Sequence, residues 1–229
     1  MNFLKLACSL SSIVVLSTPA LAQETQSGGE KDIQVELGTT QESQKGSPFL
    51  TVRTLSISGN ILSRARLELE QPFWVSQKGL KQNPTLGVVW KLQDTPSQIV
   101  AFHPQYDFGN PALAARRRIT SGNQNLILPL EAEFGDEQAG LLSLSLGAIL
   151  ADGRTTTGIY SLGLSRSMGA NLKLGTELEA SGGQDLGHLN GEFHLGPKLQ
   201  MTLDYAVPIH RPRSGDIKSL FSAGITCPF

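Results

Sequence analysis

Cysteine and histidine are scarce in this sequence. The 229 residues include two cysteines and four histidines. Cys8 lies in an N-terminal apolar segment that we expect to be removed, which leaves Cys227 alone and excludes a disulfide within the mature chain. Neither a C-x-x-C nor an H-x-x-x-H spacing is present, so nothing builds a closed metal site. We therefore expect no metal and no cofactor.

An excess of one charge and long apolar runs are also missing. Lys and Arg number 19 against 20 Asp and Glu, for a formal net charge of −1. That balance gives no reason to expect a nucleic-acid partner. After the N-terminal segment, no apolar run reaches the roughly 18 residues that a spanning helix needs. Contact with a membrane would have to come through strands or at its surface.

The first 22 residues, MNFLKLACSLSSIVVLSTPALA, have the parts of a secretory signal peptide. Lys5 supplies a short positive region, residues 13–16 are the centre of an apolar stretch, and residues 20–22 form an A-x-A cleavage site. We expect residues 1–22 to be a signal peptide and the polar residues 23–31 to be a flexible leader. The folded domain is then predicted over residues 32–229.

Apolar and polar residues alternate through most of this domain. In NLKLGTELEA, residues 171–180, leucines occupy one side of an extended chain, and Lys173, Glu177 and Glu179 occupy the other. A period of two predicts a β-strand, because successive side chains leave opposite faces. Such segments recur about 12 times, between turn clusters such as SGGQDLG and ADGRTTTG. The fold class is predicted to be all-β.

Two architectures produce this alternation. In a soluble sandwich or barrel the apolar face forms the core, whereas in an outer-membrane barrel it faces lipid and the polar face lines the lumen. Periodicity alone does not distinguish them. Opposite charges mixed on the polar face, and leucines mixed with small residues on the apolar face, favour the second. The sequence therefore predicts a closed antiparallel transmembrane β-barrel of about 12 strands (10–14), in the outer membrane of a Gram-negative bacterium. A soluble periplasmic β protein is the alternative.

The polar faces of the strands would line the lumen of such a barrel. The residues expected there are Arg64, Arg66, Glu68, Glu70, Lys91, Glu131, Glu133, Lys173, Glu177, Glu179, Glu192, His194 and Asp204. Acids outnumber bases in this set, so an open pore is predicted to prefer cations or neutral solutes. His103 also falls on a polar face, whereas His188 and His210 are expected in loops.

The C-terminal segment FSAGITCPF alternates apolar residues and ends on an aromatic one. This resembles the signature by which outer-membrane barrels are recognised for assembly, so Phe221, Ile225 and Phe229 are expected to address the barrel-assembly machinery. Two features fit a barrel less well. Aromatic residues make up only 6% of the chain, which is few for girdles at both interfaces. Pro104 and Pro129 fall within predicted strands, where each removes a ladder donor.

At whole-chain level the order of segments resembles a family of bacterial outer-membrane proteins named for the meta-pathway of phenol degradation. The resemblance runs through DIQVELGTT, LSRARLELEQPF, NPTLGVVWKLQ, FHPQYDFGNP, NLILPLEAEF, LKLGTELEA and GPKLQMTLDYAVPI. It implies a barrel of about 12 strands with a role in transport of organic compounds. The mid-chain PTG loop of the family is replaced here by HPQYDFGNP. The family has no catalytic residue to carry over.

An enzyme is not expected. The sequence has no G-x-S-x-G elbow, and no histidine stands at a telling spacing from a serine. We expect a channel or transporter for small molecules, hydrophobic organic compounds among them, in contact with outer-membrane lipid. A non-conducting structural barrel, or one that binds lipid or lipopolysaccharide, is the alternative. The basic cluster Arg116, Arg117 and Arg118 is either a solvated loop or a contact for lipopolysaccharide phosphates or an anionic solute.

Overall fold

The structure, a computed structural model, describes residues 33–44, 49–117, 124–151, 155–181, 184–196, 198–212 and 216–228. The expected signal peptide and leader, residues 1–31, lie outside these ranges and stay predictions, and Phe229 and Arg118 lie outside them too. No helix within the described ranges has the length and apolar character to cross a membrane.

Thirteen strand segments and a short helix make up the described chain. They are β1 (Ile33–Gln44), β2 (Leu50–Leu62), β3 (Ala65–Val75), β4 (Thr85–Thr95), β5 (Gln98–Phe102), β6 (Gln105–Asp107), α2 (Pro111–Arg117), β7 (Asn125–Asp136), β8 (Gly140–Ala151), β9 (Thr155–Ser167), β10 (Leu172–Ser181), β11 (Gln184–Gly196), β12 (Leu199–Pro208) and β13 (Ile217–Pro228).

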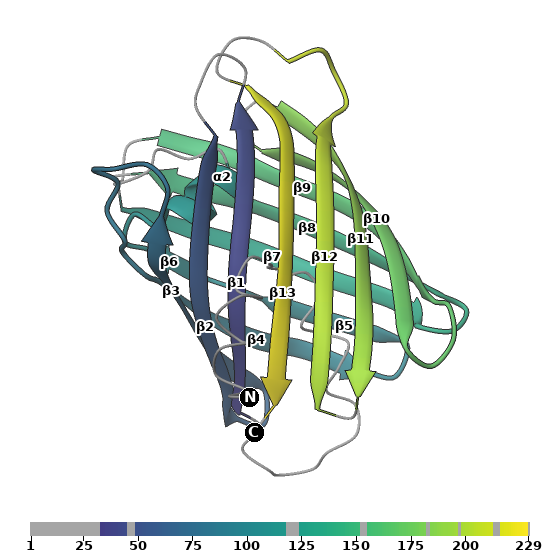
Figure 1. Cartoon of the computed structure of the whole chain (residues 1–229). Coiled ribbons are helices and arrows are strands. Elements are labelled where there is room, and N and C mark those ends of the chain that lie inside the picture. The colour runs from purple at the N-terminus through teal and green to yellow at the C-terminus, as the bar shows by residue number, and fades with distance from the viewer. Residues whose placement is uncertain are drawn as a thin grey trace, which may run out of the picture.

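The strands close into a ring in which neighbours in sequence are neighbours in space. Every pairing is antiparallel, and β13 returns to pair with β1. β5 and β6 both lie between β4 and β7, so they are two parts of one wall strand. The predicted closed antiparallel barrel of 12 strands is confirmed. Figure 1 shows the front wall, from β2 through β1 and β13 to β11, crossing the rear wall at a steep angle, as the strand tilt of a closed barrel requires.

The interruption between β5 and β6 comes from the two prolines. Register is kept across it, because Phe102 pairs with Leu130 and Gln105 pairs with Ile127. The N–H of His103 donates to the carbonyl of Pro129, but Pro129 has no N–H to return the bond. One wall strand is therefore interrupted and consists of two segments, with His103 at the break.

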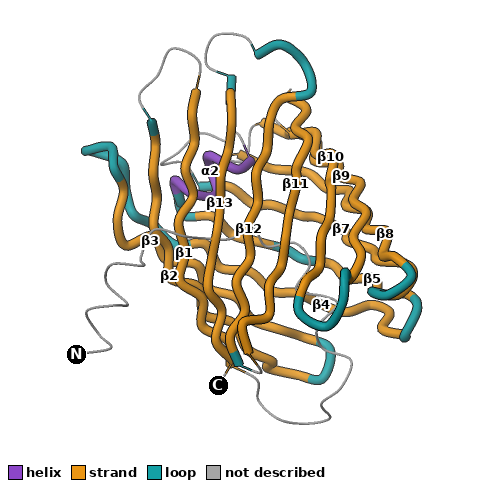
Figure 2. The backbone as a smooth tube through the Cα atoms, turned by 45° about the vertical axis from the view of Figure 1, so that its right-hand side comes forward, coloured by secondary structure: helices purple, strands orange, loops and turns teal. Residues whose placement is uncertain are grey.

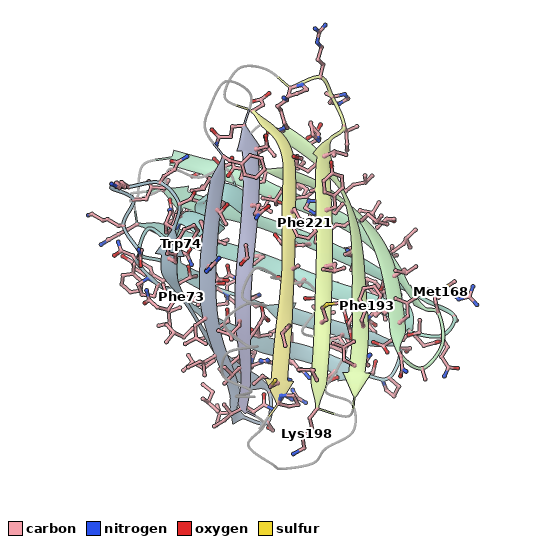
Figure 3. All side chains as sticks on the ribbon, viewed as in Figure 1. Phe73, Trp74, Met168, Phe193, Lys198 and Phe221 are labelled. Atoms are coloured by element: carbon pink, nitrogen blue, oxygen red, sulfur yellow. The ribbon has the colours of Figure 1, made fainter. Side chains whose placement is uncertain are left out.

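Apolar side chains cover the outer surface of the barrel. Leu146, Leu164 and Leu178 are 58%, 61% and 53% exposed, as expected for side chains that face lipid. Outward aromatic residues are spread along the strands. Phe73, Trp74, Tyr106, Phe108, Tyr205 and Phe221 lie toward one end, Phe134 and Phe193 lie toward the other, and Trp90, Phe102 and Tyr160 lie near the middle of their wall strands. Figure 3 shows Phe73 and Trp74 projecting from the outer wall. The aromatic residues are thus not confined to the two interfaces.

The two ends of the barrel differ in their connections. Short turns join β2 to β3, β4 to β5, β7 to β8, β9 to β10 and β11 to β12, at the end where β13 finishes. We call this the turn end. The longest connections, residues 76–84, 108–124 and 209–216, are at the opposite end, which we call the loop end. An even number of wall strands accounts for β1 beginning and β13 finishing at the same end.

Three local predictions are corrected. His188 is not in a loop, because β11 begins at Gln184 and carries His188 as a buried residue. The strand starts five residues before Leu189, where the alternation of polar and apolar residues becomes clear in the sequence. Arg64 is exposed in the turn between β2 and β3, not in the lumen, since β2 ends at Leu62 and β3 begins only at Ala65. The polar connection after β6 contains the helix α2, which the strand pattern did not predict.

Candidate functional site

The inner side of the barrel wall is identified by contacts that pass over an intervening strand. The guanidinium of Arg66 in β3 donates hydrogen bonds to Gln34 in β1 and to Ser58 in β2. The ring of His103 lies 3.1 Å from the Glu68 carboxylate, with β4 between them. Side chains separated by a whole strand meet only on the concave side of a sheet. These residues therefore point into the lumen.

Twelve of the residues expected in the lumen lie within strands, and their side chains alternate with the exposed leucines. They are buried or half-buried: Arg66, Glu68, Glu70, Lys91, Glu131, Glu133, Lys173, Glu177, Glu179, Glu192, His194 and Asp204. Glu36, Glu42 and Asp107 share the same inward rows of β1 and β6 and were not in the predicted set. These additions increase the excess of acids over bases.

His103 brings two acids together at the break between β5 and β6. Its Nε2 lies 3.1 Å from Glu68 Oε2, and its Nδ1 lies 3.3 Å from Glu131 Oε1. Gly87 leaves the room for this contact, because a Cβ there would stand 3.3 Å from His103 Nε2. We call these three side chains the His103 cluster. It ties β3 to β7 across β4.

A second histidine joins acids on the opposite wall. His188 in β11 places Nδ1 3.2 Å from both carboxylate oxygens of Asp204 in β12. Its Nε2 lies 3.8 Å from Glu179 in β10 and makes no hydrogen bond with any residue that the structure describes. Asp204 is 1% exposed. Asp204 orients the ring, and no hydroxyl or thiol within the described ranges makes a hydrogen bond with Nε2.

The remaining inward bases are each paired with an acid. Lys91 Nζ lies 3.0 Å from Asp94, and Lys173 Nζ lies 2.8 Å from Glu137. His194, more exposed than the other two inward histidines, is 3.3 Å from Glu192. Because acids outnumber bases, this pairing leaves the interior with an excess of negative charge.

The helix α2 lies inside the ring of strands near the loop end (Figures 1 and 2). It contacts β2 and β3 on one side. From the other side, inward-facing isoleucines of β7, β8 and β9 (Ile127, Ile149 and Ile159) pack with Leu113 of the helix. The helix thus spans the lumen and narrows it.

Asn110 fixes α2 in this position. Its Oδ1 accepts from the N–H groups of Ala112 and Leu113, which makes it the N-cap of the helix. Its Nδ2 donates to Glu70 Oε1 at 2.8 Å and to Thr85 Oγ1 at 3.2 Å. Asp107 accepts from the Asn110 N–H and from Asn125 Nδ2. Asp107, Asn110 and Asn125 are all fully buried, so the helix is attached to the wall by a buried polar network.

Sequence patterns did not predict this network, although two signals for it are present. Asn110 followed by Pro111 is a helix start, with an N-cap residue before proline at the first helical position. Ile127, Ile149 and Ile159 break the polar side of three strands near the loop end. An apolar residue in a polar lumen needs an apolar partner, and α2 supplies it.

Small side chains line one part of the lumen wall. Ser143 in β8, Gly163 and Ser165 in β9, and Asn190 in β11 border a cavity of about 50 Å³ together with Lys173, Glu177 and Glu192. The space depends on the absence of a side chain at Gly163, where a Cβ would stand 2.3 Å from Ser143 Oγ. This part of the interior, along β8–β11, therefore offers hydroxyl, amide and carboxylate groups.

The other predicted sites are placed as follows. Arg116 and Arg117 belong to the last turn of α2, at the loop end, and Arg118 lies outside the described residues. Phe221 and Ile225 lie on the outer face of β13, the strand that closes the ring with β1, and Phe229 lies outside the described residues. Within the described ranges, no group of three or more His, Cys, Asp and Glu side chains is arranged to hold a metal ion.

Comparison with known proteins supports the fold. No protein-family model and no curated protein sequence matches the chain. Among solved structures, the KdgM porin aligns with a TM-score of 0.63 at 11% identity, over 85% of this chain and 99% of the porin. An outer-membrane channel from Pseudomonas putida F1 aligns with a TM-score of 0.61 at 9% identity, over 90% and 98%. The NanC porin aligns with a TM-score of 0.59 at 8% identity, over 85% and 98%. The chain is similar in fold to outer-membrane barrels.

Proposed function

We propose that this protein is an outer-membrane channel for small molecules that prefers cations or neutral solutes. The observation that carries the proposal is a closed barrel with an apolar outer face and an interior in which acids outnumber bases. Lipid requires every backbone polar group to be paired within the protein, and a closed ring meets that requirement. The polar side chains face the interior and not the lipid, and a polar interior can pass water and solutes.

The sign of the interior charge bears on which solutes the proposed channel would pass. One structure of the KdgM porin carries disordered oligogalacturonate, which is a polyanion. The described interior here has Arg66, Lys91 and Lys173 as strong bases, and each lies beside acids or polar acceptors. A polyanion would meet net repulsion, so the proposed solutes are cationic or neutral and rich in hydrogen-bonding groups. The hydroxyl and amide wall of β8–β11 suits them.

Planar-bilayer recording tests the proposal. In a tenfold KCl gradient, the purified protein is expected to give a reversal potential of the sign set by K⁺, and the preference is expected to weaken as total salt rises, because salt screens the interior charge. Recording in the chlorides of larger organic cations would then define the size limit. A preference for Cl⁻ would overturn the proposed selectivity. Absence of any conductance would overturn the channel itself.

The position of α2 favours a second candidate, a barrel that does not conduct at rest. The helix is attached to the wall on one side and packed against isoleucines on the other. A lumen narrowed in this way suits a structural or lipid-binding barrel. Release of the helix, discussed below, distinguishes a permanently filled barrel from a channel with a constriction.

The remaining assignments are also proposals. Arg116 and Arg117 at the loop end fit contact with lipopolysaccharide phosphates, since longer loops are extracellular in barrels of this class. Phe221 and Ile225 on the closing strand fit recognition by the barrel-assembly machinery. We propose no catalysis: the His188–Asp204 pair is read as lumenal packing. Membership of the meta-pathway family stays a prediction.

A further inference from the structure

A cavity opens at the turn end of the lumen, between the β4–β5 and β7–β8 turns. Its volume is about 190 Å³, several times the roughly 30 Å³ that one water molecule occupies in the liquid. The polar groups that line it are Thr95, Ser97, Gln98, Glu133, Asp136 and Glu137. The cavity is thus large enough for a small organic molecule and is lined by hydrogen-bond acceptors.

Glu133 is the buried acidic side chain that lines this cavity. It is 3% exposed, and neither carboxylate oxygen makes a hydrogen bond with any residue that the structure describes. The two nearby bases are engaged elsewhere, since Lys91 lies 3.0 Å from Asp94 and Lys173 lies 2.8 Å from Glu137. A buried carboxylate without hydrogen bonds is unfavourable unless a donor reaches it. No residue in the described ranges supplies one, so the cavity is where a donor can enter.

We propose that this cavity binds the guanidinium group of a small organic cation, through both oxygens of Glu133. A guanidinium presents two parallel N–H donors, which match two carboxylate oxygens without hydrogen bonds better than the point charge of an ammonium does. Its remaining N–H groups can donate to the hydroxyl and amide oxygens of Ser97 and Gln98, and Asp136 adds negative charge at the cavity. A metal ion is not the proposed ligand, because the described residues offer no group of three ligating side chains.

The site lies at the end where the strands are joined by short turns, close to one opening of the lumen. The site extends the proposed channel function, because a cation held there would be concentrated at the mouth of a cation-preferring pore. Only this role in transport rests on the proposed function. Binding itself does not require conduction. The inference and the channel can therefore be tested separately.

Ligand-observed saturation-transfer NMR on the full chain in detergent micelles tests the site, with methylguanidinium as the probe. We expect saturable binding by the native protein and at least a tenfold higher Kd for Glu133→Gln, which keeps the shape and removes the charge. Asp185→Asn is the matched control, because that acid lies at the other end of the barrel, near the start of β11, and already has His210 as its partner 3.5 Å away, and its Kd is expected to stay within twofold of the native value. Methylammonium is expected to bind more weakly than methylguanidinium.

A second variant guards against a folding artefact. Ser97→Leu lies in an exposed turn and places an apolar side chain in the cavity, so it is expected to raise the Kd while the heat-modifiable gel mobility of a folded barrel is kept. Equal binding by native protein, Glu133→Gln and Ser97→Leu would overturn the inference. Bilayer recording of the same preparation separates the two proposals: conduction without methylguanidinium binding contradicts the site alone, and binding without conduction contradicts the channel alone.

Discussion

At the scale of single residues, each inward histidine contacts at least one carboxylate. His103 and His194 both contact a glutamate at 3.1–3.3 Å, but His103 is 10% exposed and contacts Glu131 as well as Glu68, whereas His194 is 39% exposed and contacts Glu192. The same pair of residue types therefore occurs in a closed and in an open environment. Burial should decide what each pair contributes to stability.

Replacement of His103 by leucine is expected to lower the free energy of unfolding by about 1–3 kcal/mol, because the half-buried Glu131 is left without its donor and Glu68 loses one of its partners. His194→Leu is the control and is expected to cost less than about 1 kcal/mol, since water can replace the lost contact. Urea titration of folding into phospholipid vesicles measures both. Equal losses for the two variants would show that the His103 cluster has no special role.

At the scale of elements, sequence patterns determined the strands well and the lumen helix poorly. β10 was predictable because lipid on one face and polar lumen on the other impose a strict period of two on Leu172–Ser181. α2 was not predicted because a seven-residue helix is too short to show a helical period in the sequence. Its apolar partner Ile127 looked like an isolated exception on the polar face of a strand. The contact of Glu68 with His103 follows from register and strand tilt, which no local pattern contains.

Release of α2 is the prediction at this scale. Asn110→Ala removes the N-cap and the two hydrogen bonds to Glu70 and Thr85, so the helix is expected to leave the lumen more often and single-channel conductance is expected to rise severalfold or to fluctuate between two levels. Loss of an N-cap alone costs about 1 kcal/mol.

The control is Asn83→Ala. The Asn83 side chain donates to the exposed carbonyl of Phe108, at the start of the connection that contains α2. That variant keeps the contacts of α2 inside the barrel, so native conductance is expected. Native conductance in both variants would contradict a gating role for the helix and favour a barrel that stays filled.

At the scale of the whole molecule, the stability of the barrel depends on which medium surrounds the outer leucines. Leu146 lies at the middle of β8 and is 58% exposed, and Leu195 lies near the turn end of β11 and is 57% exposed. Their exposure is nearly identical, but in a membrane they lie at different depths. A charge placed at each position therefore compares the centre of the bilayer with its edge.

Leu146→Arg is expected to destabilise the folded barrel in vesicles by about 2–4 kcal/mol, and Leu195→Arg by about 0–1 kcal/mol, because the cost of an outward arginine falls from the midplane to the interface. Urea titration of vesicle-inserted protein gives both values, with Leu146→Ala and Leu195→Ala as controls for the loss of the leucine itself. In a soluble β protein both side chains would meet water, and both arginines would be tolerated equally. A depth-dependent difference can arise only if lipid surrounds the leucines and the acids enclose the lumen.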